Sequence, residues 1–252
     1  MKTQQKIKYL VLLSAYFGSR IVSLAAPGDE NWDHSFGVPG ANGIVAPMVV
    51  VGHTLYAGGR FSQIGGVEAA NIAQWDGTNW SPLGLGVNGG VAAIVASGTD
   101  LFVAGGFNDA GGNNIAKWDG TNWWALGTGL DLYAYVLAVS GNKLFVGGFF
   151  TSAGGVAATN IAMWDGSSWT NLGGGVNSAV TTLAADGTNL FAGGYFSRAG
   201  SVAANNVAKW DGHEWSAMGV NAWTTNGGIA FLPPALELCC QDRALREYAN
   251  LH

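Results

Sequence analysis

One ten-residue stretch decides the fold of this chain: Asn-Ile-Ala-Gln-Trp-Asp-Gly-Thr-Asn-Trp, residues 71–80. Related stretches return at residues 114–123, 160–169 and 206–215. The first Trp of each Trp-Asp-Gly triplet stands at position 75, 118, 164 or 210, so the periods are 43, 46 and 46 residues. An apolar run ending in a Gly-Gly pair precedes each copy: Gly58-Gly59, Gly105-Gly106, Gly147-Gly148 and Gly193-Gly194. Regular returns of this length are typical of repeat proteins.

A single copy reads as four short strands. In the copy at residues 91–127, apolar runs at 91–97 and 101–104 are followed by runs at 114–118 and 123–126, with Gly-containing turns between them. Four such strands in sequence form one blade of a β-propeller. We therefore predict an all-β propeller with four recognisable blades, whose ring either closes or stays open or truncated.

The repeated residue types have physical roles in such a blade. A Gly-Gly pair allows backbones to approach closely where a side chain would collide. Asp-Gly favours a tight turn between strands. The two Trp residues of each copy are large enough to fill the space between blades.

The order of these features resembles that of kelch repeats: an apolar run, Gly-Gly, an aromatic residue followed by Asp, then Trp-x-x-Leu. It is also similar to repeats of fungal cortical marker proteins for cell polarity and of large secreted bacterial proteins. The resemblance covers residues 32–219 and implies a propeller, most often a binding module. Typical kelch units carry Tyr-Asp-Pro where this chain has Trp-Asp-Gly, so the secreted repeats are the nearer match.

The two ends differ from the repeats. Residues 1–25 combine three Lys residues, a short apolar run and a Ser-Leu-Ala site, which predicts a signal peptide and a secreted or cell-surface protein. Repeats then occupy residues 26–219, starting with an orphan fourth strand at 32–37. Residues 220–252 form a divergent, charged tail. It is either a cap on the last blade or unrelated sequence that replaces further repeats, as a frameshift would produce.

Charge restricts the partners. Removal of residues 1–25 leaves seven basic and sixteen acidic residues, a net charge of −9. Without a basic stripe, nucleic acid is not expected as a partner. We expect no membrane insertion after signal cleavage, and we expect self-association through open blade edges.

The sequence contains no recognisable catalytic set. The four Asp residues of the Trp-Asp-Gly triplets invite comparison with a calcium site, but Gly follows each of them, which favours a role in turns. The four His residues occupy unrelated repeat positions, and the adjacent Cys239 and Cys240 lie outside the repeats. We therefore predict no catalytic residue, no metal site and no cofactor.

Repeat positions that change are the candidates for binding. After the Gly-Gly pair, matching positions carry Gln63, Asp109, Ser152 and Arg198. Variation on one face of a repeat protein indicates a binding face, although neutral drift on a solvated loop would look the same. The predicted function is a non-catalytic exported propeller that binds protein or carbohydrate or acts as a surface scaffold. The alternatives are a secreted propeller enzyme of glycosidase or oxidase type, and a truncated fragment of a longer repeat protein.

Overall fold

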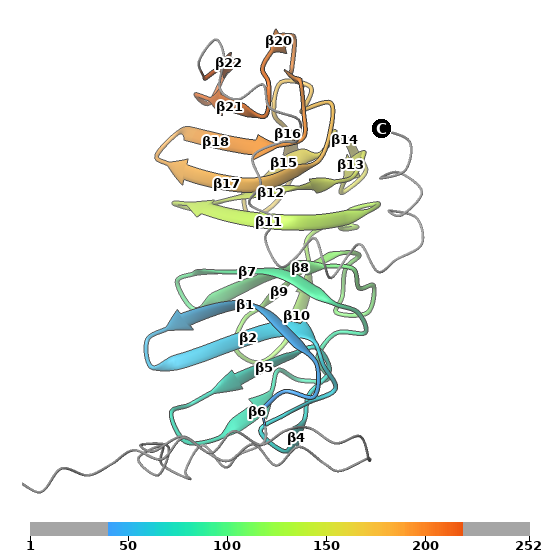
Figure 1. Ribbon diagram of the computed structural model, residues 1–252, viewed down its shortest axis with the longest axis vertical. Coiled ribbons are helices and arrows are strands. Elements are labelled where there is room, and N and C mark those ends of the chain that lie inside the picture. Colours follow the sequence, from blue (N-terminus) through green and yellow to red (C-terminus); the bar gives the residue numbers. More distant parts are fainter. Residues whose placement is uncertain (1–39, 219–252) are drawn as a thin grey trace, which may run out of the picture. The chain divides into compact units, whose positions relative to one another are not determined.

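The computed structural model describes residues 40–218, which form an all-β succession of antiparallel sheets (Figure 1). Each repeat builds one four-stranded sheet. Sheet 1 contains β1 (Ile44–Val51), β2 (Thr54–Arg60), β5 (Ile72–Trp75) and β6 (Trp80–Pro82). Sheet 2 contains β7 (Val91–Ser97), β8 (Asp100–Gly105), β9 (Ile115–Trp118) and β10 (Trp123–Ala125).

The second half of the described chain repeats this plan. Sheet 3 contains β11 (Tyr133–Ser140), β12 (Lys143–Phe149), β15 (Ile161–Trp164) and β16 (Trp169–Asn171). Sheet 4 contains β17 (Val180–Asp186), β18 (Asn189–Gly194), β21 (Val207–Trp210) and β22 (Trp215–Ala217). The prediction of four short antiparallel strands per repeat is confirmed. The predicted signal peptide, the orphan strand at 32–37 and the divergent tail lie outside the described residues.

The sheets pack face to face in chain order. Their first strands, β1, β7, β11 and β17, lie side by side, each against the next (Figure 1). Three apolar clusters fill the three spaces between successive sheets. This explains why the strands read as nearly continuous apolar runs, because inner sheets are covered on both faces.

The Trp pairs lie across the third and fourth strands. Trp118 and Trp123 are directly opposite each other, with ring centroids 5.1 Å apart, and the other three pairs have centroids 5.4 to 5.5 Å apart. Both rings of this pair join the cluster between sheets 1 and 2, as Trp210 and Trp215 join the one between sheets 3 and 4. The predicted filling of the space between sheets by Trp is confirmed.

A hydrogen bond ties each of these fourth strands to the sheet before it. The Nε1 of Trp169 donates to the carbonyl of Leu126 at 2.7 Å, and Trp215 repeats the bond to Leu172 at 2.7 Å. Trp123 makes the same bond to Leu83 at 3.0 Å. The Trp residues therefore connect neighbouring sheets by a directed bond as well as by apolar contact.

The glycine pairs have two separate roles. A Cβ on Gly147 would lie 2.5 Å from a methyl of Val180 in the next sheet, while a Cβ on Gly148 would lie 2.2 Å from the carbonyl oxygen of Tyr133 on the adjacent strand. The first Gly thus permits sheet packing and the second permits strand pairing at a bulge. In sheet 2 the register places Ala104, not Gly105, at the position equivalent to Gly147, because Ala104 pairs with Ile115 as Gly147 pairs with Ile161. The expected alignment of Gly105-Gly106 with the other pairs is therefore wrong by one residue.

The short period of 43 residues has a local cause. Sheets 1, 3 and 4 each carry a small hairpin between the second and third strands: β3 (Gln63–Ile64) with β4 (Val67–Glu68), β13 (Ser152–Ala153) with β14 (Val156–Ala157), and β19 (Arg198–Ala199) with β20 (Val202–Ala203). Repeat 2 is three residues shorter here and has no such hairpin. The difference in period thus lies in a surface loop and leaves the four-stranded sheet intact.

Candidate functional site

The four residues predicted to form a binding face occupy one place in every repeat, just after the second strand. We call Gln63, Asp109, Ser152 and Arg198 the variable row. Gln63, Ser152 and Arg198 begin the small hairpins, and Asp109 stands in the shorter loop of repeat 2. Because the sheets pack in chain order, the structure brings the variable row to one end of the described sheets. Each member stays within its own repeat.

In repeats 1, 3 and 4 a side chain from the preceding connection holds the backbone of the row member. The Oδ1 of Asn177 accepts the backbone N–H groups of Ser197 and Arg198, both at 2.9 Å. Asn42 holds the N–H of Gln63 in the same way at 3.0 Å. These bonds fix the backbone under the variable side chains, so their exposed groups project from a rigid base.

Repeats 2 and 3 use the same contact with different partners. Asp131 accepts the N–H groups of Thr151 and Ser152 at 2.9 and 3.0 Å. In repeat 2 the direction is reversed, because the carboxylate of Asp109 accepts the N–H of Asn88 at 2.9 Å. Sequence reasoning missed these supporting residues. Their signal is an Asn or Asp about 20 positions before the variable row, preceded two residues earlier by Gly: Asn42, Asn88, Asp131 and Asn177.

Two hollows open at this end of the sheets. One has a volume of about 510 Å³ and includes Gln63, Glu68 and the exposed Leu85. The other, about 490 Å³, lies where repeat 2 has no hairpin, and is lined by Asn88, Asn108, Asn113, Asn114, Asp131 and Tyr133 among others. The second hollow is rich in amide groups, which donate and accept hydrogen bonds equally well. Such surfaces suit polar, uncharged ligand groups.

A second set of Asn residues has an unusual backbone conformation. Asn71, Asn114, Asn160 and Asn206 all have positive φ, between 61° and 64°. Asn tolerates this left-handed region better than other side chains that carry a Cβ. The Nδ2 of Asn160 donates to the carbonyl of Val176, in the connection to the next sheet, at 2.9 Å. Asn71 and Asn114 donate likewise to Val87 and Leu130. These residues stabilise the base of the variable row, and Asn114 also lines the second hollow.

The Asp residues of the Trp-Asp-Gly triplets lie at the opposite end of the sheets, in the turns between third and fourth strands. The Oδ1 of Asp76 accepts the N–H groups of Thr78 and Asn79, both at 2.7 Å, and Asp211 holds His213 and Glu214 in the same way. The predicted turn role is therefore confirmed. The N–H of Asn79 is the main reason why the pKa of Asp76 lies below its ordinary value, because hydrogen bonds to a carboxylate favour its charged form.

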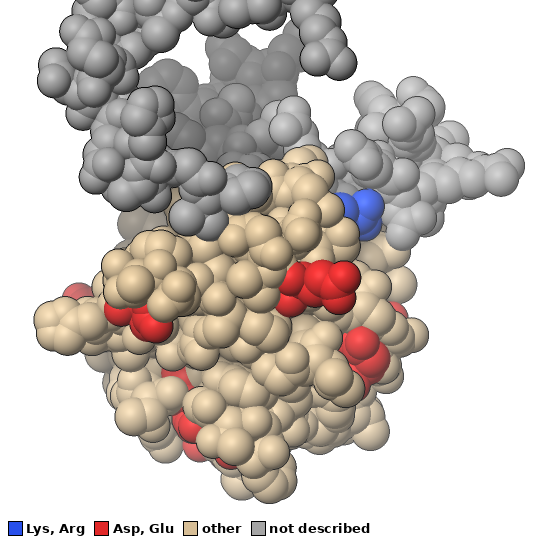
Figure 2. Space-filling model, turned by 90° about the horizontal axis from the view of Figure 1, so that it is seen from below, with Lys and Arg blue, Asp and Glu red and all other residues tan. Residues whose placement is uncertain are grey.

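The described part of the chain carries few charged residues and no cluster of metal-ligating side chains. Residues 40–218 hold five Lys or Arg and ten Asp or Glu, and the face in Figure 2 is mostly uncharged, with acidic side chains standing apart from one another. Within this part of the chain, no three His, Cys, Asp or Glu residues lie close enough to hold a metal ion. No helix among the same residues is long and apolar enough to cross a bilayer.

Comparison with known proteins gives one weak relative. Polarized growth protein rax2 of Schizosaccharomyces pombe is 42% identical to the chain over 76 residues, which are 29% of this chain and 6% of that protein. The chain therefore corresponds to only a small part of that relative's length. No family model matches the chain.

Among solved structures, the chain is similar to the computationally designed Ika4 protein, with a TM-score of 0.46 and 16% identity over 69% of this chain and 94% of that one. The β-propeller domain of the Trilobed protease from Pyrococcus furiosus aligns with a TM-score of 0.42 and 12% identity, over 67% of this chain and 52% of that one.

Proposed function

We propose that the chain is a non-catalytic binding or scaffold module for protein or carbohydrate, built as a kelch-like β-propeller whose blades are the four sheets. The observation that supports this most is the variable row. Four equivalent positions carry an amide, a carboxylate, a hydroxyl and a guanidinium. Three of them are held by a polar side chain from the preceding connection, and the fourth, Asp109, is bonded through its own carboxylate to the backbone of Asn88. A rigid frame with changing side chains is the usual way in which repeat proteins build a binding surface.

We also propose that the module is exported and acts at the cell surface. The support is the basic start, the short apolar run and the small residues of positions 1–25. Expression in a secreting host should yield a mature chain that starts at Ala26, which N-terminal sequencing of the medium would show. A soluble intracellular product that retains Met1 would contradict export.

Binding to intact cells tests the proposed face. The fluorescently labelled mature chain is titrated onto washed cells of the producing organism and measured by flow cytometry. The triple variant Gln63→Ser, Asp109→Ser and Arg198→Ser gives every member of the variable row the residue found at Ser152. It should weaken binding by about ten-fold or more, because side chains at the centre of an interface carry most of its affinity.

The control changes exposed positions at the other end of the sheets, Thr78→Ala and Thr121→Ala, and should bind like the wild type. Equal binding by the row variant and the wild type would contradict the proposed face. Release of labelled sugar or peptide from the cells by the wild type would favour the enzyme alternative.

A further inference from the structure

A groove lies between sheets 2 and 3, at the end opposite the variable row. It has a volume of about 460 Å³ and is lined from sheet 2 by Asp100, Lys117 and Trp124, and from sheet 3 by Lys143 and Trp164, among others. The turns β7–β8 and β11–β12 form part of its wall, since Ser97 and Asn142 also line it. A groove of this size with aromatic and polar walls is able to hold a small molecule.

Trp124 is the unusual side chain of this groove. The equivalent positions in the other sheets are Ser81, Thr170 and Ser216, so only repeat 2 places a large aromatic residue there. Trp124 is 52% exposed, and neither the apolar clusters between the sheets nor the repeat pattern requires it. A large aromatic side chain that stays exposed is more informative than a buried one.

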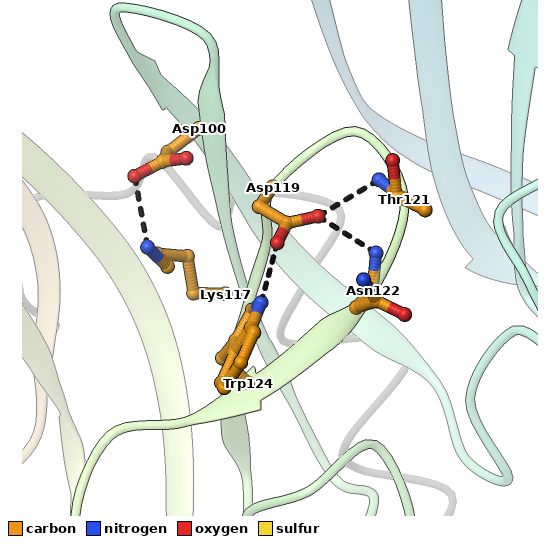
Figure 3. A network of polar contacts seen from close by, with 6 residues as sticks. All are labelled: Asp100, Lys117, Asp119, Thr121, Asn122 and Trp124. Atoms are coloured by element: carbon orange, nitrogen blue, oxygen red, sulfur yellow. Dashed lines mark hydrogen bonds and ion pairs between the residues drawn. The ribbon is translucent and has the colours of Figure 1, made fainter.

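The indole of Trp124 is nevertheless held in one orientation. Its Nε1 donates to the Oδ2 of Asp119 at 2.6 Å, while the other oxygen of that carboxylate accepts the N–H groups of Thr121 and Asn122 at 2.8 and 2.7 Å (Figure 3). The turn that positions Asp119 thus also positions the ring. A ring held before the ligand arrives loses little conformational entropy on binding.

Polar groups stand beside this ring. Lys117 Nζ lies 3.0 Å from Asp100 Oδ2, and both side chains are about one third exposed (Figure 3). Lys143 and Asn142 add a cation and an amide from the other wall. Asp119 does not line the groove but holds Trp124, so the two positive charges of Lys117 and Lys143 are matched by Asp100 in the wall and by Asp119 behind the ring. The groove therefore offers several donors and acceptors without a net charge that would select an ion.

At the corresponding place between sheets 3 and 4, a direct hydrogen bond joins the two turns. There the Oγ of Ser140 donates to the carbonyl of Gly187 at 2.8 Å. Its counterpart in sheet 2, Ser97, lines the groove instead. The two junctions thus differ in how these turns meet.

We propose that this groove binds a neutral saccharide. One sugar ring stacks its C–H face on the indole of Trp124, since the apolar face of a sugar matches an aromatic surface. Neighbouring hydroxyl groups of the same sugar accept from Lys117 and donate to Asp100, which orients the ring. This site lies at the other end of the sheets from the variable row. The saccharide proposal can therefore be tested independently of the function proposed for that row.

Isothermal titration of the mature chain with neutral gluco-, manno- and galacto-oligosaccharides tests the groove. The wild type should bind at least one of these series. The variant Trp124→Ser carries the residue of Ser81 and Ser216, so its sheet should fold normally, and it should bind about 30-fold more weakly or not at all. Lys117→Gln, which copies Gln74, should weaken binding by about ten-fold through loss of a charge-assisted hydrogen bond.

The matched control is Leu85→Ser, a change of another exposed apolar side chain outside the groove, which should bind like the wild type. Melting temperatures of all variants should agree within a few degrees. Failure of the wild type to bind any of the three series would overturn the proposal. Equal affinity of Trp124→Ser and wild type would overturn it too, as would tighter binding of the corresponding uronic-acid oligosaccharides.

Discussion

At the scale of single residues, the repeat is held by Asn and Asp side chains that bind backbone groups. Asn160 is 4% exposed and has a φ of 62°. Its Oδ1 accepts the N–H of Phe150 at 3.3 Å, and its Nδ2 donates to Val176. One side chain thus satisfies two backbone groups that would otherwise be buried without partners, which is costly.

Substitution of Asn160 separates the contribution of its hydrogen bonds from that of its left-handed backbone conformation. Asn160→Gly keeps the left-handed backbone at no steric cost but loses both hydrogen bonds, which should lower the free energy of unfolding by about 1–3 kcal/mol. Asn160→Ala adds the steric penalty of a Cβ at positive φ, about 1–2 kcal/mol more. Urea unfolding measures both variants. Equal stability of the Ala and Gly variants would contradict the role assigned to the backbone conformation.

The turn carboxylates predict acid sensitivity. The pKa of Asp165 lies below its ordinary value, first because it accepts the N–H of Ser168 and then because of its bonds to Ser167. A carboxyl whose pKa is depressed in the folded state stabilises the fold above its unfolded pKa, about 3.9. This contribution is lost as the pH falls below that value and through the folded pKa. Asp76, Asp119 and Asp211 are shifted in the same direction.

Melting temperatures between pH 6 and pH 2 check this dependence. The wild type should lose stability below about pH 4, where the unfolded carboxyl groups take up protons before the folded ones. Asp165→Asn keeps an oxygen that can accept the turn bonds but cannot titrate in this range. Its stability should therefore fall less steeply with acid. Parallel curves for the two proteins would show that this turn does not contribute.

At the scale of elements, the fourth strand of one sheet is bonded to the sheet before it. The Trp N–H to Leu carbonyl bonds recur at three junctions. Trp118 differs from these, because its Nε1 is buried and has no hydrogen-bond partner among the described residues. Trp118 on a third strand and Trp169 on a fourth strand are thus both buried but differ in this hydrogen bond.

A pair of Phe substitutions should reveal this bond. Trp169→Phe and Trp118→Phe both shorten a buried ring by a similar volume, but only the first removes a hydrogen bond and leaves the Leu126 carbonyl without that partner. We expect Trp169→Phe to lower the free energy of unfolding by about 1 kcal/mol more than Trp118→Phe. Denaturant unfolding of both variants measures the difference. A larger loss for Trp118→Phe would contradict the role of the bond.

At the scale of the whole molecule, the two outermost faces of the described sheets differ. On β1, Met48 and Val50 are 61% and 65% exposed. Their counterparts in sheets 2 to 4 pack against the preceding sheet: Ile94 and Ala96, Leu137 and Val139, and Leu183 and Ala185. The far face of sheet 4 instead exposes Thr182, Ala184 and Asp186. The end face of sheet 1 is therefore apolar, whereas that of sheet 4 is mixed.

Self-association should depend on the face of sheet 1. The mature chain is expected to form larger species as its concentration rises, because exposed apolar side chains at Met48 and Val50 gain by burial. The double variant Met48→Lys and Val50→Thr should remain smaller at the same concentration, whereas Leu85→Ser should behave like the wild type. Sedimentation velocity distinguishes these outcomes. A wild type that stays monomeric at every concentration would contradict this prediction.

The sequence by itself determined the repeat, its four strands and the turn role of the Asp residues. The period follows from comparing the copies, and the roles of Gly, Asp and Trp follow from local geometry and nearest-neighbour packing. It also located the variable row, because equivalent positions share a place in the fold whatever residue they hold. The roles of Asn42 and Asn177, about 20 positions from the groups that they bind, were not visible in a single copy.

Only the tertiary structure decided which positions meet across repeats. Trp124 looks like an ordinary member of an aromatic repeat until its exposure and its bond to Asp119 are known. The groove beside it needs Lys117 from one sheet and Lys143 from the next, and no spacing within a repeat predicts that contact. The shift of one residue at Gly105 was hidden for the same reason, since register depends on the partner strand. Local pattern fixes each sheet, whereas packing between sheets creates the surfaces that can bind.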